Sequence, residues 1–216
     1  MSLVIAIDGP AAAGKGTLAK RLAAHFGLPH LDTGLLYRAT GRRVLDAGGD
    51  PADPATAEAA ARALRPEDFR RPDLRGPAAD TAAAAVASIP AVRAALLDFQ
   101  RDFGRARGAV LDGRDIGTIV FPDARVKLFV TASAEARGHR RWLELRARGA
   151  AADLDEVTAQ VRVRDQQDRD RTAAPLVAAP DAVVLDTTHR DADATFDRAL
   201  ELIGTRLTAA EMPPNP

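Results

Sequence analysis

Short apolar runs of β-type residues alternate along this chain with longer segments in which apolar positions recur at helical spacing. We predict strands at five of these runs, residues 4–8, 29–31, 109–112, 126–131 and 182–185. Each run ends at or just before polar or glycine residues. This alternation is typical of a parallel sheet with crossover helices, in which ligands collect at the carboxyl ends of the strands. The pattern therefore predicts an α/β fold.

Two long segments separate the predicted strands. In the first, residues 35–107, a Gly-, Pro- and Asp-rich loop at 47–77 holds a short helix around 56–64, and an alanine run at 81–87 precedes a helix from Pro90 to Arg107. The second, residues 135–171, is predicted to be helical and is rich in arginine. Two such excursions from one core predict two mobile flaps, one that holds an acceptor and one that closes over a donor. The tail, residues 212–216, is expected to be disordered.

Composition excludes several classes of protein. The 216 residues are enough for one domain or two, and 30 basic against 30 acidic residues leave no net charge to recruit nucleic acid or an anionic membrane. The absence of cysteine excludes disulfides, cysteine nucleophiles and thiolate metal sites. No apolar run approaches the ~20 residues of a membrane span. We therefore expect a soluble, cytoplasmic protein without a polymeric nucleic acid or a membrane as partner.

The start of the chain carries a phosphate-binding pattern. An apolar strand leads into a loop bounded by Gly9 and Gly14, and helix-forming residues follow. Glycine takes positive φ without steric cost, so the loop N–H groups and the helix N-terminus are able to surround a phosphate, to which Lys15 adds a mobile charge. The loop departs from the strict Gly-x4-Gly-Lys-Ser/Thr pattern, because Gly16 replaces the magnesium-binding hydroxyl and Thr17 follows one residue later. We predict a nucleotide-binding protein, specifically a kinase, rather than an ordinary turn.

Polar residues also gather at two other strand ends. After the second strand, Thr33 is a candidate helix cap, Arg38 lies one turn into that helix, and Tyr37 is either a site residue or a core aromatic. After the third strand, residues 112–115 bring two carboxylates and an arginine to the same edge of the sheet, where a structural salt bridge is the alternative. Asp112 is placed to orient waters around a phosphate-bound Mg²⁺, which retains several waters in proteins.

A fourth cluster lies in the arginine-rich segment. Arg164, Asp168 and Arg171 fall on one face of a helix at i, i+4 and i+7. By composition alone, a solvated helix with surface ion pairs would be the better interpretation. The presence of a phosphate loop in the same chain favours an anion-binding role instead.

Taken together, these clusters resemble bacterial cytidylate kinases, a family of the nucleoside monophosphate kinase superfamily. The resemblance rests on the loop at 9–17, the segment 31–38, the run 112–118 with Phe121-Pro122-Asp123-Ala124, and the run 164–171 with Ala174-Pro175-Leu176. It covers nearly the whole chain in the expected order. It is specific, because nucleoside monophosphate kinases in general share the first motif and not the last two.

The resemblance implies a three-layer α/β sandwich of the P-loop nucleoside triphosphate hydrolase type with a parallel core sheet. It implies one domain, with a core at residues 1–34, 108–134 and 172–210, a flap that binds the nucleoside monophosphate at 35–107, and a lid at 137–164. The segment 64–81 is too short for the antiparallel β insert of longer family members, so the chain resembles the short form. We expect a monomer.

The resemblance also implies roles for individual residues. The expected ATP-binding residues are Gly9, Pro10, Ala11, Ala12, Ala13, Gly14, Lys15, Gly16, Thr17 and Arg137. The expected acceptor-binding residues are Thr33, Tyr37, Arg38, Arg93, Arg114, Asp115, Arg164, Asp168 and Arg171. The expected catalytic charges are Lys15, Arg38, Arg114, Arg140, Arg141 and Arg171, and Asp112 is expected to hold the metal through water.

By the same resemblance, two of these residues read the base. Asp115 would accept a hydrogen bond from the exocyclic amine of cytosine, and Arg93 would donate to the ring carbonyl and ring nitrogen. The family has a third base contact, a serine, where this chain has Ala84. Ser88, one helical turn further along, is a candidate to replace it. The loss of the serine bears on how strongly cytosine is preferred.

The implied reaction is phosphoryl transfer from ATP, with Mg²⁺, to CMP or dCMP, which gives ADP and CDP or dCDP. One alternative is another small-molecule P-loop kinase that acts on UMP, AMP or a metabolite hydroxyl, the last of which would need a carboxylate base. A second alternative is a nucleotide-binding regulator without turnover.

Overall fold

The computed structural model describes residues 2–208, so the predicted tail at 212–216 lies outside the described residues. The chain divides into two compact units, Met1–Leu31 with Gly104–Pro216, and Asp32–Phe103. Within the described part, no single helix is long and apolar enough to span a bilayer, and the bent pair Pro77–Ala87 and Pro90–Arg107 meets those criteria only by length and composition.

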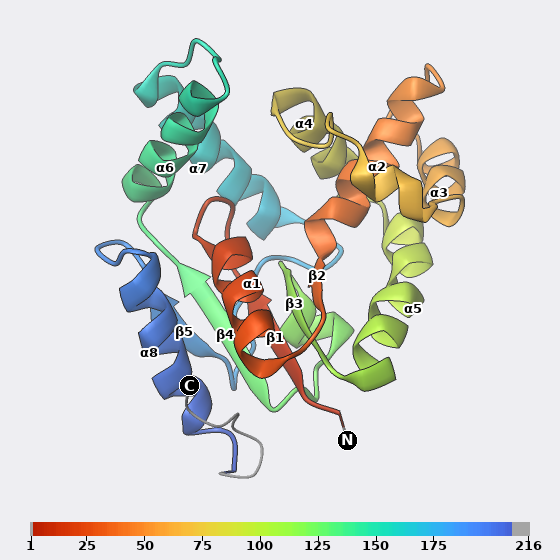
Figure 1. Ribbon diagram of the computed structural model, residues 1–216. Helices are drawn as coiled ribbons and strands as arrows, with labels where there is room; N and C mark the ends of the chain where they lie inside the picture. The colour runs from red at the N-terminus through yellow and green to blue at the C-terminus, as the bar shows by residue number, and fades with distance from the viewer. Residues whose placement is uncertain (1, 209–216) are drawn as a thin grey trace. The chain divides into compact units, whose positions relative to one another are not determined.

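The first unit is built on a five-stranded sheet with the order β2-β3-β1-β4-β5 (Figure 1). The strands are β1 (Val4–Asp8), β2 (His30–Asp32), β3 (Ala109–Gly113), β4 (Val126–Thr131) and β5 (Val183–Asp186). The pairs of β1 with β3 and β4, and of β4 with β5, are parallel. The predicted α/β fold with a parallel sheet is therefore confirmed, and β1 lies at its centre.

Three strands differ from their predicted bounds by one residue. β2 covers 30–32 instead of 29–31, β3 covers 109–113 instead of 109–112, and β5 covers 183–186 instead of 182–185. Pro29 has no N–H to donate, although its carbonyl accepts a hydrogen bond from the Val110 N–H at 2.9 Å. The apolar pattern therefore locates each strand, and backbone chemistry sets its ends.

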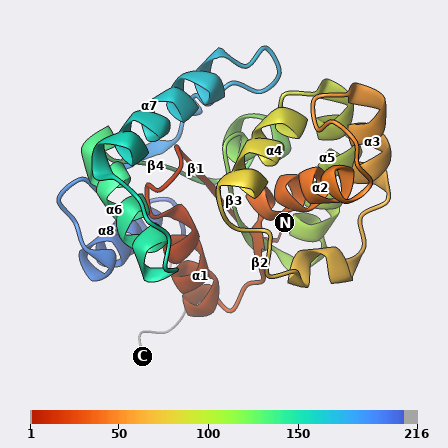
Figure 2. The same cartoon turned by 90° about the horizontal axis from the view of Figure 1, so that it is seen from above.

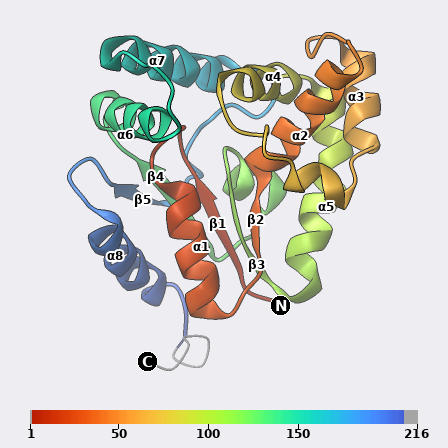
Figure 3. The ribbon, with the colours of Figure 1, turned by 45° about the horizontal axis from the view of Figure 1, so that its top comes forward.

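Helices α1 (Lys15–Phe26) and α8 (Ala192–Gly204) pack against each other and cover one face of the sheet (Figure 3). Their inner side chains join the sheet in one core, which includes Ile5, Ile7, Leu22, Leu128 and Ile203, all at most 2 % exposed. Since α1 begins at Lys15, directly after the loop that follows β1, this core fixes both ends of the phosphate loop.

The predicted helical segment 135–171 forms two helices, α6 (Ala134–Ala147) and α7 (Leu154–Asp170). A turn containing Gly149 at φ 78° separates them. The two helices lie side by side (Figure 2). A Cβ at Gly138 would lie only 2.2 Å from Thr158 Oγ1, so glycine permits their close approach.

The second unit is helical, with α2 (Thr33–Asp46), α3 (Pro54–Arg62), the short 3-10 turn η1 (Pro66–Arg70), α4 (Pro77–Ala87) and most of α5 (Pro90–Arg107). The predicted helix at 90–107 is confirmed. A Cβ at Gly41 would lie 2.8 Å from the Cβ of Ala82, so α2 and α4 pack closely through small residues. The alanine run at 81–87 thus forms a helix interface.

Three local predictions for this unit are corrected. Thr33 is not the cap of α2, because the Asp32 side chain accepts from the Leu35 N–H at 3.2 Å and Thr33 is already helical. The helix predicted at 56–64 begins at Pro54, where Asp53 caps it. The loop predicted at 47–77 also contains η1, where Asp68 accepts from the Arg65 N–H.

Candidate functional site

The phosphate loop has the backbone that its glycines predict. Gly9 has φ 146° and Gly14 has φ 90°. A Cβ at Gly9 would lie 1.9 Å from the backbone oxygen of Val130, so only glycine lets the loop leave β1 this close to β4. Ala12 also adopts positive φ, at 59°. Backbone strain at a non-glycine residue is typical of ligand-binding loops, and no local pattern predicted it.

Lys15 is the first residue of α1 and is 6 % exposed. Its Nζ donates to the Pro10 carbonyl at 2.7 Å, across the mouth of the loop. Burial, together with repulsion from Arg114, lowers the pKa of Lys15 to about 7. Asp112, Asp8 and Asp168 oppose this shift without cancelling it, so a bound phosphate would further favour the charged form of the amine.

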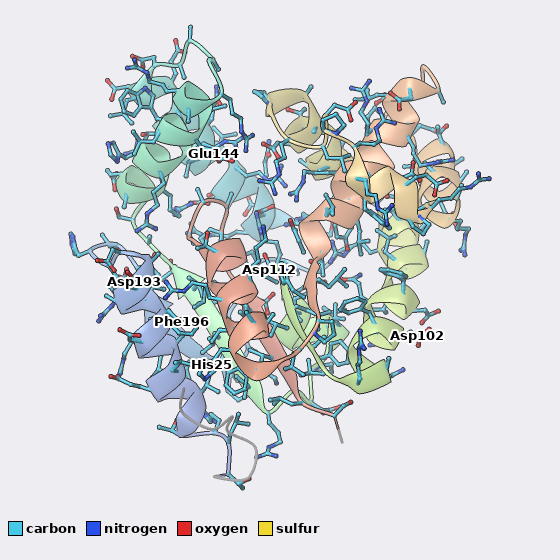
Figure 4. All side chains as sticks on the ribbon, viewed as in Figure 1. His25, Asp102, Asp112, Glu144, Asp193 and Phe196 are labelled. Carbon is cyan, nitrogen blue, oxygen red and sulfur yellow. The ribbon has the colours of Figure 1, made fainter. Side chains whose placement is uncertain are left out.

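Asp112 lies in β3, at the carboxyl end of the sheet (Figure 4). Its Oδ1 is 2.6 Å from Nε2 of His30 in β2. A Cβ built on Gly16 would lie 3.9 Å from Asp112 Oδ2, so this carboxylate faces the start of α1. His30 was not predicted as a site residue, because the adjacency of β2 and β3 cannot be seen in the chain order.

Asp168 is the centre of an arginine cluster. It is 2 % exposed and is contacted by Arg114 Nε at 2.7 Å, Arg164 Nε at 3.2 Å and Arg171 Nη2 at 2.6 Å. Burial alone would raise the pKa of Asp168, but these three guanidinium groups hold it at about 2. The structure thus brings together four predicted acceptor-binding residues, with a surplus of positive charge.

Asp8 and Asp115 are both buried beside this cluster, each 5 % exposed. Burial raises the pKa of Asp8 to about 6, although the N–H groups of Gly117 and Ile116 oppose the shift. Asp8 was not predicted as a site residue, since it reads as the last residue of an apolar strand. Asp115 was predicted, and its backbone carbonyl accepts from the Ile119 N–H at 2.9 Å.

The three predicted arginines of α6 have different surroundings. Arg137 is 3 % exposed and forms a two-pronged ion pair with Asp165 of α7, while its Nη1 also donates to the Ala11 carbonyl at 3.3 Å. Arg140 donates to Oγ1 of Thr187 at 3.0 Å, and Arg141 donates to Glu144 at 2.9 Å. Arg137 and Arg140 are therefore packed into the protein, whereas Arg141 has a partner in its own helix.

Thr187 also belongs to this region and was not predicted. Its Oγ1 donates to the Ala13 carbonyl of the phosphate loop at 3.1 Å. Thr187 follows β5 directly, so the order of the strands brings it beside the loop. The sequence pattern at Thr187, a hydroxyl residue directly after a strand end, is a weak indication of a site residue.

In the second unit, Arg38 folds back onto the start of its own helix. Its Nη2 donates to Asp32 Oδ2 at 2.7 Å, and Nε has no hydrogen-bond partner among the described residues. A Cβ at Gly34 would lie 2.9 Å from Arg38 Nη1, so Gly34 leaves room for the guanidinium group. Thr33, beside them in the sequence, is buried.

Two predicted acceptor-binding residues of this unit, Tyr37 and Arg93, lie close to each other. Tyr37 is 9 % exposed and packs in the hydrophobic cluster of the unit. The guanidinium carbon of Arg93 lies 5.3 Å from the centre of the Tyr37 ring, and Arg93 Nη1 donates to the Ala87 carbonyl at 3.1 Å. Ser88 is exposed, and its hydroxyl donates to the Ala85 carbonyl at 2.7 Å.

Known proteins resemble this chain along nearly its full length. A sugar kinase structure from Janibacter sp. is 14 % identical with a TM-score of 0.52, covering 99 % of each chain, which is a likeness of fold. A cytidylate kinase from Granulibacter bethesdensis is 66 % identical over 94 % of this chain and 97 % of the relative. Another from Acidiphilium cryptum is 64 % identical over 93 % and 95 %. The sequence profile of the cytidylate kinase family matches residues 5–205. The chain belongs to the cytidylate kinase family.

Proposed function

We propose that this chain transfers the γ-phosphoryl group of ATP to the phosphate of CMP or dCMP, and that Lys15 and the Asp168 arginine cluster carry the charge for this step. The observation that supports the proposal most directly is the convergence of Arg114, Arg164 and Arg171 on one buried carboxylate. Three guanidinium groups around one carboxylate retain a surplus of positive charge, which an acceptor phosphate would neutralise. The charges of Arg114 and Asp168 both act on the amine of Lys15.

The donor side of the proposed site is the phosphate loop. Its backbone N–H groups and the N-terminus of α1 would bind the ATP phosphates, and Lys15 would move from the Pro10 carbonyl to a phosphate oxygen. Arg137 would act on the nucleotide through the loop, because its guanidinium group holds the Ala11 carbonyl and Asp165. Arg140 and Arg141 remain the proposed lid arginines for the transferring phosphoryl group.

The proposed reaction includes Mg²⁺ bound to the nucleotide, and Asp112 would hold it through water. Asp112 suits this role because its Oδ2 faces Gly16 and its Oδ1 is oriented by His30. Residues 2–208 contain no cluster of three or more His, Cys, Asp or Glu side chains suited to a metal ion. The cation would therefore be held mainly by phosphate oxygens and waters, and when bound it would neutralise charge on the phosphates.

No general base is required in this proposal, because the attacking oxygen already belongs to a phosphate anion. Phosphoryl transfer depends on in-line positioning and on neutralisation of charge, with little covalent work for the protein. Arg38, Thr33, Tyr37 and Arg93 stay predicted acceptor ligands from residues 32–103. A monomeric state and a cytoplasmic location also stay predictions, to be tested by light scattering and by cell fractionation.

An acceptor panel in a coupled ADP assay tests the function. CMP and dCMP should give the highest kcat/KM, above UMP, AMP and hydroxyl acceptors such as nucleosides. The Lys15→Ala variant, assayed in parallel, reports ADP from contaminating kinases. Preference for UMP, AMP or a hydroxyl acceptor would assign the chain to another reaction, and tight ATP binding without ADP from any acceptor would indicate a regulator.

A further inference from the structure

Asp8 connects the phosphate loop to the acceptor side of the first unit. It is the last residue of β1 and precedes Gly9, the first residue of the loop. Its carboxylate bonds two consecutive backbone N–H groups, with Oδ1 accepting from Ile116 and Oδ2 from Gly117, both at 2.7 Å. Two short, charge-assisted bonds from one carboxylate fix both the position and the orientation of the segment that they hold.

The segment that Asp8 holds has no other acceptors for these two groups within its own turn. β3 ends at Gly113, which is in register with Asp8 of β1, and the chain then turns through Arg114 and Asp115 into the short π-type turn Ile116–Val120. The Asp115 carbonyl accepts from the N–H groups of Ile119 and Val120. The first N–H groups of such a turn point outward, as at any helix start, and require an external acceptor.

Gly117 lets the carboxylate approach. A Cβ at this position would lie 3.3 Å from Asp8 Oδ2 and 3.2 Å from Lys127 Cδ, tighter than most real contacts. The arrangement therefore depends on a carboxylate at position 8 and on the lack of a side chain at position 117. Both features are specific to this contact, since β1 and β3 would pair through their backbones without either of them.

We propose that Asp8 is a positioning residue that sets Arg114 and Asp115 relative to the phosphate loop. Arg114 and Asp115 lie directly before the two bonded N–H groups, and the peptide bond of Asp8 leads into Gly9. Any shift of the 114–117 turn relative to β1 would break the pair of bonds. The acceptor readout below rests on the proposed function, in which Arg114 contacts the acceptor phosphate and Asp115 the base.

The burial and the hydrogen bonds of the Asp8 carboxylate agree with this role. Burial raises the pKa of Asp8 to about 6, so the folded protein holds a carboxylate where the loss of water disfavours its charge. Lys15 lowers this pKa and Asp115 raises it, and Asp8 also interacts with the charge of Arg114. A buried carboxylate is costly unless hydrogen bonds compensate for lost water, and the two N–H groups supply part of that compensation.

The test replaces Asp8 by Asn, which has the same shape but only one acceptor atom. In the wild type, the amide protons of Ile116 and Gly117 should exchange slowly with solvent, and in Asp8→Asn at least one of them should exchange faster while the Val110 amide of β3 stays protected. In Asp8→Asn, the KM for CMP should rise at least ~5-fold. The preference for CMP, measured as the ratio of kcat/KM for CMP to that for UMP, should fall by a similar factor. The KM for ATP should change less than ~2-fold. Asp191→Asn is the matched control, because Asp191 also accepts from a backbone N–H, at the exposed start of α8.

Unchanged amide protection in Asp8→Asn would overturn the proposal, and so would faster exchange with wild-type acceptor kinetics. A rise confined to the KM for ATP would show that Asp8 serves the phosphate loop alone, which also contradicts it. If Asp8→Asn does not fold, Gly117→Ala decides through the same measurements, because it disturbs the contact and keeps the carboxylate. If the wild type does not prefer CMP, the role of Asp115 fails, while amide protection and the KM of the best acceptor still decide the role of Asp8.

Discussion

At the scale of single residues, Lys15 and Asp8 are two buried groups next to the phosphate loop whose pKa values are strongly shifted. Lys15 is buried, and its Nζ rests on the Pro10 carbonyl. A charge that is already placed where phosphoryl negative charge develops needs no reorganisation during the reaction. This placement is the physical reason to expect a large effect from its removal.

Lys15→Ala should retain the fold and lower kcat with CMP at least ~100-fold, because a preorganised charge in a water-excluded site contributes several kcal/mol to transition-state stability. Steady-state kinetics measures this loss, with circular dichroism as the check on folding. Lys20→Ala is the control, since Lys20 is exposed on the same helix. Near-wild-type turnover of Lys15→Ala would contradict the assignment.

The lowered pKa of Lys15 predicts that nucleotide binding takes up a proton. With a pKa of about 7, the free protein holds mostly neutral Lys15 at pH 8, whereas a bound phosphate favours the charged amine. The affinity for ATP should therefore weaken as pH rises above 7. Calorimetry at pH 8 in buffers of different ionisation enthalpy should report uptake of about one proton. Lys15→Met should abolish this uptake, and equal uptake by both proteins would assign the proton to another group.

Base selection is the third prediction at this scale. CMP and dCMP should exceed UMP in kcat/KM by ~10-fold or more, about 1.4 kcal/mol, because the hydrogen bond that buried Asp115 would accept from the exocyclic amine is lost when the substrate lacks the amine. Asp115→Ala should narrow this gap, and Ala84→Ser should widen it or leave it unchanged. Asp123→Ala, at an exposed carboxylate further along the same loop, is the control. A preserved CMP preference in Asp115→Ala would refute the base-reading role.

At the scale of elements, the two helices of the predicted lid are joined by a Gly149 turn and tied to the phosphate loop at one end. The Arg137–Asp165 pair links α6 to α7, and Arg137 also holds the Ala11 carbonyl. The buried end of the helix pair is therefore expected to be rigid, and the turn between the helices is its accessible part. This changes where cleavage of a mobile lid is expected.

Trypsin should cut the ligand-free protein after Arg146 or Arg148, beside the turn, and not after the buried Arg137. A bisubstrate analogue that joins adenosine to cytidine through a phosphate chain should suppress this cleavage, because a closed lid is ordered. Arg148→Gln identifies the product that arises from cutting after Arg148. The same cleavage rate with and without the analogue would argue against closure.

At the scale of the whole molecule, the Asp168 cluster contributes to stability in a defined pH range. The pKa of Asp168, about 2, lies below the ordinary 3.8. The ionised carboxylate therefore stabilises the folded state fully above pH 5, and this stabilisation is lost as pH falls toward 2. The difference in unfolding free energy between wild type and Asp168→Asn should therefore shrink by about 2 kcal/mol between pH 5 and pH 2. Urea titrations measure it, with the exposed Asp197→Asn as control. A difference independent of pH would contradict the role of charge.

The sequence by itself determined the α/β class, the phosphate loop and most of the chemistry at the strand ends. The strands at 4–8 and 126–131 and the helix at 90–107 have their predicted bounds. These features depend on local periodicity and on glycine and proline geometry, which act over a few residues. The positive φ of Gly9 and Gly14 could be predicted for the same reason.

Only the tertiary structure decided which side chains meet across the sheet. His30 meets Asp112 because β2 lies beside β3, and Asp8 meets Ile116 because β1 and β3 end in register. Arg137, which the family resemblance implies as an ATP-binding residue, meets Asp165 through the packing of α6 on α7. These partners lie 28 to 108 residues apart in the chain, so strand order and helix packing, which local patterns do not encode, bring them together.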